Sequence, residues 1–285
     1  MVKRIKIGQM IIDLTYSYDA YFSDKLDPYR SDETANKVHT LSIETLEEIT
    51  PPNKDITFTY KNRYKMVSEE ETYIVTHFNQ GKGIKHMIYH TNDYQTIKIY
   101  LNKKLGQRLA EYEYVLSGMA FFEMALVSGY LPVHASCIHY KNHTFLLSGP
   151  SKSGKSTQTN YFMQAYPASI IINEDKPLVY FKDHQAYVVG SPWSGKHVIN
   201  ANMERPLDFM FFIEKAKDLK IKELSKNKKI QEVFRNIHRP GDEVLVDQMM
   251  TIVDHMMHDL DIYAFACIHH IQSAYYLYKF MEENL

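Results

Sequence analysis

A glycine-flanked loop in the middle of the chain carries the strongest chemical signal. It matches the pattern G-x-x-x-x-G-K-[ST] at every fixed position. Its two glycines allow a tight turn in which successive backbone N–H groups point inward, where they can surround a phosphate chain. The pattern therefore predicts a nucleotide-binding P-loop. The loop comprises Gly149, Pro150, Ser151, Lys152, Ser153, Gly154, Lys155, Ser156 and Thr157.

Two side chains of this loop have expected tasks. Lys155 would reach the β- and γ-phosphates of ATP, and Ser156 would hold Mg²⁺ through its hydroxyl. The apolar segment Phe145–Ser148 is typical of a buried strand entering the loop, and Thr157–Ala165 is typical of a helix leaving it. The N-terminus of such a helix adds partial positive charge at the phosphates. We therefore expect ATP and Mg²⁺ as ligands.

A pair of carboxylates follows the next short apolar run. Glu174 and Asp175 come directly after Ile170–Asn173. Adjacent carboxylates repel each other unless a cation shares them, so both are expected to bind Mg²⁺. One of them would also serve as the general base that takes a proton from the attacking hydroxyl. The residues leave open which one does so, and a solvated turn is the alternative interpretation.

The stretch of about residues 131–197 resembles HPr kinase and the wider group of HPr-kinase-like kinases, whose P-loop domains are related to phosphoenolpyruvate carboxykinase. These proteins carry a histidine on the strand before the P-loop, matched here by His134. They also have an acidic pair after the P-loop helix, matched by Glu174 and Asp175. Gly190–Lys196 is similar to the G-T-P-W-x-G segment of the small HPr-kinase-like proteins.

This resemblance implies a fold and an activity. The fold would be α/β, with a P-loop kinase domain of the HPr kinase/phosphoenolpyruvate carboxykinase type. The activity would be transfer of the γ-phosphate of ATP to a serine-type hydroxyl of a peptide, a protein or a free amino acid. By the same resemblance Asp175 or Glu174 is the general base, and His134 lies near the γ-phosphate, where it assists the transfer or orients a carboxylate. A hydrogen-bonded core histidine is the alternative for His134.

The sequence also departs from the family. Both positions of the acidic pair are usually Asp in these kinases, so Glu174 is a difference. HPr kinase proper has a Glu-x-Arg-Gly-type signature after the pair, which the sequence does not show. Its C-terminal Arg-Pro-Gly-Arg-Asn loop is replaced by Arg-Pro-Gly-Asp-Glu at Arg239–Glu243. The resemblance therefore does not imply phosphorylase activity or HPr itself as the substrate.

Two further residues are substrate-binding candidates. Trp193 could stack on a base, and Lys196 could hold an anionic group of the acceptor. A packing anchor is the alternative for Trp193. An NTPase, a carboxykinase-like enzyme and a nucleotide-binding regulatory protein without catalysis remain alternatives to the kinase. The presence of Lys155, Ser156 and Asp175 argues against the regulatory protein.

The elements that must position these residues differ along the chain. The first hundred residues consist mostly of short β-type segments, which predicts a small β-rich domain with an antiparallel sheet over residues 1–106. A P-loop catalytic domain is expected over residues 107–285, with its first helix at Gln107–Val127 and a strand at Leu131–His139. Tyr18–Asn36 is compatible with a loop or a short helix. We expect the acceptor to dock on the N-terminal domain.

Composition narrows the class of protein. Hydrophobic residues make up 45% of the 285, which excludes a disordered chain, and the net charge of −1 argues against a dedicated nucleic-acid binder. Two cysteines cannot form a disulfide framework. The longest apolar candidate, Met119–Leu131, is interrupted by Glu123 and Gly129. We therefore expect a soluble cytoplasmic protein with no nucleic-acid or membrane partner, and the oligomeric state stays open, a homo-oligomer included.

Overall fold

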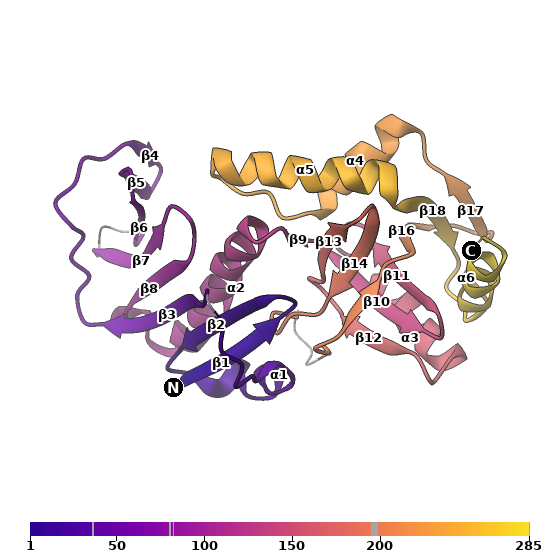
Figure 1. Cartoon of the computed structure of the whole chain (residues 1–285), viewed down its shortest axis with the longest axis horizontal. Helices are drawn as coiled ribbons and strands as arrows, with labels where there is room; N and C mark the ends of the chain where they lie inside the picture. Colours follow the sequence, from indigo (N-terminus) through magenta and orange to yellow (C-terminus); the bar gives the residue numbers. More distant parts are fainter. Residues whose placement is uncertain (36, 80, 82, 195–198, 285) are drawn as a thin grey trace. The chain divides into compact units, whose positions relative to one another are not determined.

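The computed structural model describes residues 1–35, 37–79, 81, 83–194 and 199–284. The protein is a mixed α/β chain with several sheets (Figure 1). It divides into two compact units, Met1–Ser128 and Gly129–Leu285. Among the described residues, no helix is both long enough and apolar enough to cross a membrane.

The first unit is built on an eight-stranded sheet in the order β1-β2-β3-β8-β7-β6-β5-β4. Two neighbouring pairs, β2–β3 and β3–β8, are parallel, so the prediction of a purely antiparallel sheet is wrong there. Parallel neighbours need a crossover connection, and short helices between residues 19 and 29 form part of the one after β2. The strands are β1 (Val2–Ile7), β2 (Met10–Thr15), β3 (His39–Leu46), β4 (Phe58–Tyr60), β5 (Arg63–Val67), β6 (Glu71–His77), β7 (Ile84–Thr91) and β8 (Thr96–Asn102).

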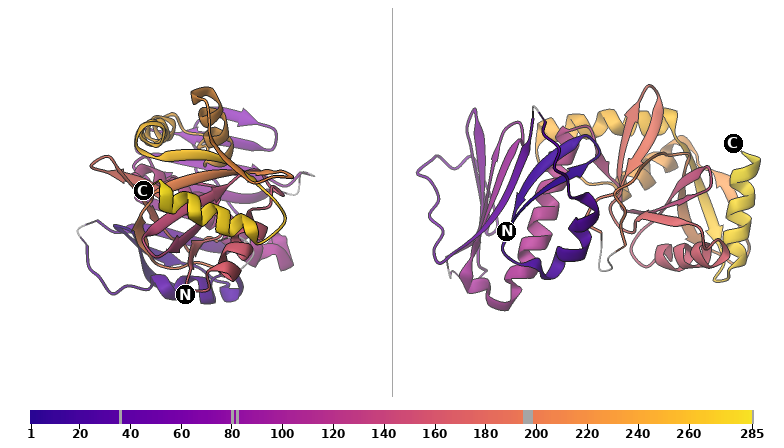
Figure 2. Two further views of the ribbon diagram at one scale, coloured as in Figure 1. Left: turned by 90° about the vertical axis from the view of Figure 1, so that its right-hand side faces the viewer. Right: turned by 60° about the horizontal axis from the view of Figure 1, so that its bottom comes forward.

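Helix α2 (Leu109–Val127) packs on this sheet against β3 and β8 (Figure 2). Its buried Glu113 accepts hydrogen bonds of 2.7 Å from the backbone N–H groups of Ser17 and Tyr18. The helix therefore belongs to the first unit, whereas the sequence predicted a domain boundary near residue 107. A helical hydrophobic pattern shows that a helix has a buried face but not which sheet covers it.

The second unit contains a six-stranded sheet, β12-β10-β11-β16-β18-β17, and a four-stranded sheet, β15-β14-β13-β9. Helix α3 contacts β10 and β11 of the larger sheet as well as helix α6, and α5 contacts β13 and β14 of the smaller one. The strands are β9 (Leu131–Pro132), β10 (Ala135–Tyr140), β11 (His143–Ser148), β12 (Ile170–Asn173), β13 (Leu178–Lys182), β14 (Gln185–Val189), β15 (Glu204–Pro206), β16 (Phe209–Lys215), β17 (Lys220–Glu223) and β18 (Asp261–Cys267). The helices are α3 (Lys155–Ala165), α4 (Lys226–Asn236), α5 (Glu243–Asp259) and α6 (Gln272–Glu283).

The centre of the larger sheet is apolar and parallel. Strand β16 pairs in parallel with both β11 and β18, and every residue of β11 is buried. The aromatic rings of Phe145, Phe162 and Phe211 lie in this core, with Phe145 and Phe162 4.9 Å apart. Burying one such side chain contributes about 1.5–3 kcal/mol to the stability of the folded state. The strand that leads into the P-loop is therefore held firmly on both faces.

The strand predicted over Leu131–His139 is broken at its middle. Strand β9 joins the four-stranded sheet through β13, whereas β10 joins the six-stranded sheet. Between them the N–H of Val133 bonds to Pro177 O (3.0 Å), and the N–H of His134 bonds to Asn236 O (2.6 Å). His134 therefore lies at the seam between the two sheets.

Candidate functional site

The loop predicted to be a P-loop, residues 149–157, follows β11 and runs into α3, so the flanking strand and helix are where the sequence placed them. Gly149 and Gly154 have φ of +147° and +109°, a region that side chains with a Cβ rarely adopt. A Cβ at Gly149 would also lie 2.9 Å from Ser153 Oγ. That Oγ is buried and has no hydrogen-bond partner among the residues that the structure describes. A buried donor of this kind suits a phosphate oxygen, so the loop fits the group that its pattern predicts.

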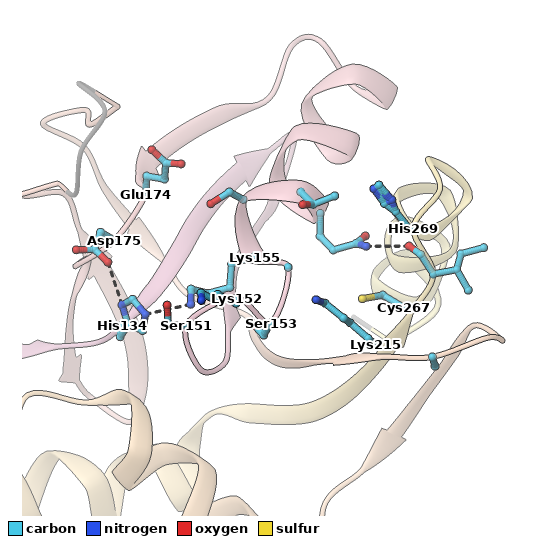
Figure 3. A pocket seen from close by; sticks show the side chains of 16 residues that line it. His134, Ser151, Lys152, Ser153, Lys155, Glu174, Asp175, Lys215, Cys267 and His269 are labelled. Atoms are coloured by element: carbon cyan, nitrogen blue, oxygen red, sulfur yellow. Dashed lines mark hydrogen bonds and ion pairs between the residues drawn. The ribbon is translucent and has the colours of Figure 1, made fainter.

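Lys155 lies across the mouth of this loop. Its Nζ donates a hydrogen bond of 2.7 Å to Gly149 O and lies 3.0 Å from Nε2 of His134 (Figure 3). Burial lowers the pKa of Lys155, Asp175 opposes this shift, and Lys176 adds to it. The amine therefore lies in a partly desolvated site, where its interaction with an anion is stronger than in water.

His134 connects this lysine to an acidic residue. An ammonium group can only donate, so Nε2 of His134 accepts from Lys155 and the proton of a neutral ring is on Nδ1. Nδ1 lies 2.9 Å from Oδ1 of Asp175. The contact is close rather than well aligned, since this buried Nδ1 has no hydrogen bond of good geometry among the described residues. Lys155, His134 and Asp175 thus form a continuous polar chain.

The charge of Asp175 is set by opposing influences. Burial raises its pKa, but contact with His134 and the positive charges of Lys176 and Lys155 together outweigh burial. The pKa of Asp175 therefore lies below its usual value. The side chain is an ionised acceptor at neutral pH, as a general base requires.

The turn that carries the acidic pair is fixed by Asn173, the last residue of β12. Its buried Oδ1 accepts the N–H groups of Asp175 (2.9 Å) and Lys176 (2.7 Å). Its Nδ2 donates to Ser191 O at 2.9 Å. In Figure 3 Asp175 is joined to His134, whereas Glu174 points away from that contact. The two carboxylates therefore occupy different environments.

The side chains of Lys155, His134, Glu174 and Asp175 line one cavity of about 820 Å³. That volume is within the range of small-molecule sites. The part of the cavity wall at the carboxyl ends of β16 and β18 was not predicted from the sequence. Parallel strands bring their carboxyl ends to one edge, which is the signal that could have found it. The residues missed there are Lys215, Ala216, Cys267, Ile268 and His269, and Gln158 of helix α3 was missed as well.

Most predicted site residues meet in this cavity. His134, the loop residues 151–157, Glu174 and Asp175 all line it, while Gly149 contributes the carbonyl that holds Lys155. Pro150 is not among the lining residues; its carbonyl O lies 3.5 Å from the Lys155 amine. Trp193 is only 3% exposed and is not among the lining residues, so its position is that of a packing residue. Lys196 lies outside the described residues.

Comparisons with known proteins add little to this geometry. No family model and no curated protein matches the chain. Among solved structures, the chain is similar to the HPr(Ser) kinase/phosphatase from Coxiella burnetii, with a TM-score of 0.26 and 10% sequence identity. The match covers 44% of this chain and 96% of that one. A likeness this weak carries no argument about fold or activity, and the interpretation of the site rests on its own residues.

Proposed function

We propose that the protein is an ATP- and Mg²⁺-dependent kinase that transfers the γ-phosphate to a serine-type hydroxyl of a peptide, a protein or a free amino acid. The observation that carries the proposal is the polar chain from Lys155 through His134 to Asp175 beside the P-loop. It combines a cation for the phosphates with an ionised base in one cavity.

The residues of the P-loop would bind the nucleotide. Its backbone N–H groups and Ser153 Oγ would donate to the phosphates, and Lys155 would exchange its bond to Gly149 O for phosphate oxygens. Ser156 and the carboxylate of Glu174, both on the cavity wall, would hold Mg²⁺. When bound, Mg²⁺ neutralises charge on the phosphates. The walls beyond β16 and β18 leave room for the rest of the nucleotide.

Asp175 would act as the general base. It accepts the proton of the acceptor hydroxyl as that oxygen forms a bond to the γ-phosphorus, while the bond from this phosphorus to the bridging oxygen breaks and ADP leaves. Lys155 counters the negative charge that spreads over the phosphoryl oxygens. His134 would position the Lys155 amine and the Asp175 carboxylate relative to each other, because its ring contacts both.

The test is incubation with γ-labelled ATP, Mg²⁺ and a panel of free serine, serine-containing peptides and cell extract. We expect label on an alkali-labile serine phosphate with the wild-type protein and none with Lys155→Ala. The matched control is Lys182→Ala, an exposed lysine outside the cavity. Label released only as free phosphate would favour an NTPase, and binding of ATP without any transfer would contradict the kinase.

A further inference from the structure

A second group of metal-ligating side chains lies in the same unit, on elements that the proposed reaction does not use. His184 is in the turn between β13 and β14, while His255 and Asp259 are one helical turn apart near the end of α5. One ligand atom of each residue lies within 4.8 Å of those of the other two. His255 Nδ1 is 2.8 Å and His184 Nδ1 is 3.3 Å from Oδ2 of Asp259.

The surrounding structure directs both imidazoles to this point. Helix α5 packs against β13 and β14, which brings the turn to the helix (Figure 1). The ring of Phe181 stacks on His255, with centroids 5.4 Å apart and an angle of 21° between the planes. Asp183 and His184 have φ of +50° and +61°, as the two-residue turn of the β13–β14 hairpin requires, so the hairpin geometry fixes where His184 starts.

We propose that His184, His255 and Asp259 bind a divalent transition-metal ion of the Zn²⁺ class. Two imidazole nitrogens and one carboxylate oxygen are ligands that Zn²⁺ prefers. In a tetrahedral site with ligands at about 2.0–2.1 Å, neighbouring ligand atoms are about 3.3 Å apart. The distances of 2.8 and 3.3 Å to Asp259 are close to that spacing, so small rotations of the side chains complete the site.

The charge distribution favours a cation here. Asp259 is the last residue of α5, where the helix dipole presents partial negative charge. The side chain of His184 is 82% exposed, which leaves the remaining coordination position open to water. Open sites of three protein ligands and one water are common for Zn²⁺.

The metal would act as a clip between the β13–β14 turn and helix α5. None of the three ligands lines the P-loop cavity. Strand β13 begins at Leu178, three residues after Asp175, so the clip would fasten the hairpin that continues from the acidic pair to helix α5. The inference does not depend on the proposed kinase activity.

The test is titration of chelator-treated full-length protein with Co²⁺, a spectroscopic substitute for Zn²⁺, in excess Mg²⁺. We expect one equivalent of Co²⁺ with the visible absorption of a tetrahedral site, and competition by Zn²⁺. His184→Asn, which suits the positive φ, and His255→Ala should each weaken binding by about 10- to 100-fold or more. The matched control is His258→Ala, an exposed histidine of the same helix that bonds to Asp254 O.

Two measurements separate this site from the P-loop cavity. Asp175→Asn should retain the tetrahedral absorption, because Asp175 is no ligand of the clip. Zn²⁺ should raise the melting temperature of the wild type and of His258→Ala, but not of His184→Asn. Absence of saturable Co²⁺ binding in the wild type, or unchanged binding in His184→Asn, would overturn the proposal.

Discussion

Two of the histidine–aspartate pairs described in the second unit have nearly equal lengths but very different surroundings. His134 and Asp175 are 2.9 Å apart in the wall of a cavity, next to Lys155 and the P-loop. His255 and Asp259 are 2.8 Å apart on one helix, and His184 beside them is mostly exposed. The pair itself is therefore not diagnostic of a function.

The neighbours of each pair distinguish them. The aspartate in the cavity is buried, which raises its pKa, and this is opposed by the contact with His134 and by the charges of Lys176 and Lys155. The aspartate on the helix faces histidines, and its lowered pKa arises first from the hydrogen bond of His255. The first arrangement favours proton acceptance beside an anion, and the second favours coordination of a cation.

The largest effect is expected from Asp175→Asn. Loss of the base should lower kcat by about 10³-fold, since general acid–base catalysis typically contributes 10²- to 10⁴-fold. The affinity for ATP should change little, because Asp175 is assigned to the acceptor hydroxyl. Transfer assays and nucleotide binding would measure the two quantities. Asp208→Asn is the control, as Asp208 is also partly buried but accepts the N–H of Thr144 away from the cavity.

His134→Ala should have the next largest effect. We expect kcat to fall by about 10- to 100-fold, because Lys155 and Asp175 lose the group that aligns them. Burial raises the pKa of Asp175, and the contact with His134 is the interaction that most lowers it. Because the substitution removes this contact, the pKa of Asp175 rises. Since the ionised form is active, the acid limb of the pH–rate profile should move to higher pH. An unmoved limb would contradict the assignment, and His139→Ala, outside the cavity, should leave it in place.

Gly149→Ala tests the loop of residues 149–157, which lies beside the His134–Asp175 pair and not beside the His255–Asp259 pair. The added Cβ would lie 2.9 Å from Ser153 Oγ at a φ of +147°. Strain of this kind costs about 1–3 kcal/mol. We expect a lower melting temperature and weaker binding of ATP. Gly241→Ala is the control because a Cβ there meets no atom within 4 Å.

The smallest effect is expected from Glu174→Gln. Its carboxylate lines the cavity but points away from the contact between His134 and Asp175, so the polar chain of Lys155, His134 and Asp175 stays intact. We expect a few-fold change in kcat and a higher Mg²⁺ concentration for half-maximal rate, since one anionic ligand is lost. A loss as large as that of Asp175→Asn would reassign the base to Glu174.

The sequence predicted the local parts of this site better than the distant ones. The loop of residues 149–157 and its flanking strand and helix form one continuous segment, so pattern and spacing were sufficient to predict this strand–loop–helix arrangement. The contact of His134 with Asp175 depends on how β9 and β10 separate into two sheets, which no local pattern encodes. The wall beyond β16 and β18 was missed for the same reason. In the first unit, the parallel pairs of β3 were missed because periodicity does not specify strand direction.

The position of His134 at the seam has a mechanical consequence. Its ring is carried by a chain segment that leaves the four-stranded sheet and enters the six-stranded one within two residues. Any sliding of one sheet over the other therefore changes the spacing within the polar chain. Misplacement of about 1 Å can reduce a rate by about 10²-fold. Substitutions in the four-stranded sheet would then change the rate of the proposed transfer without contacting the nucleotide.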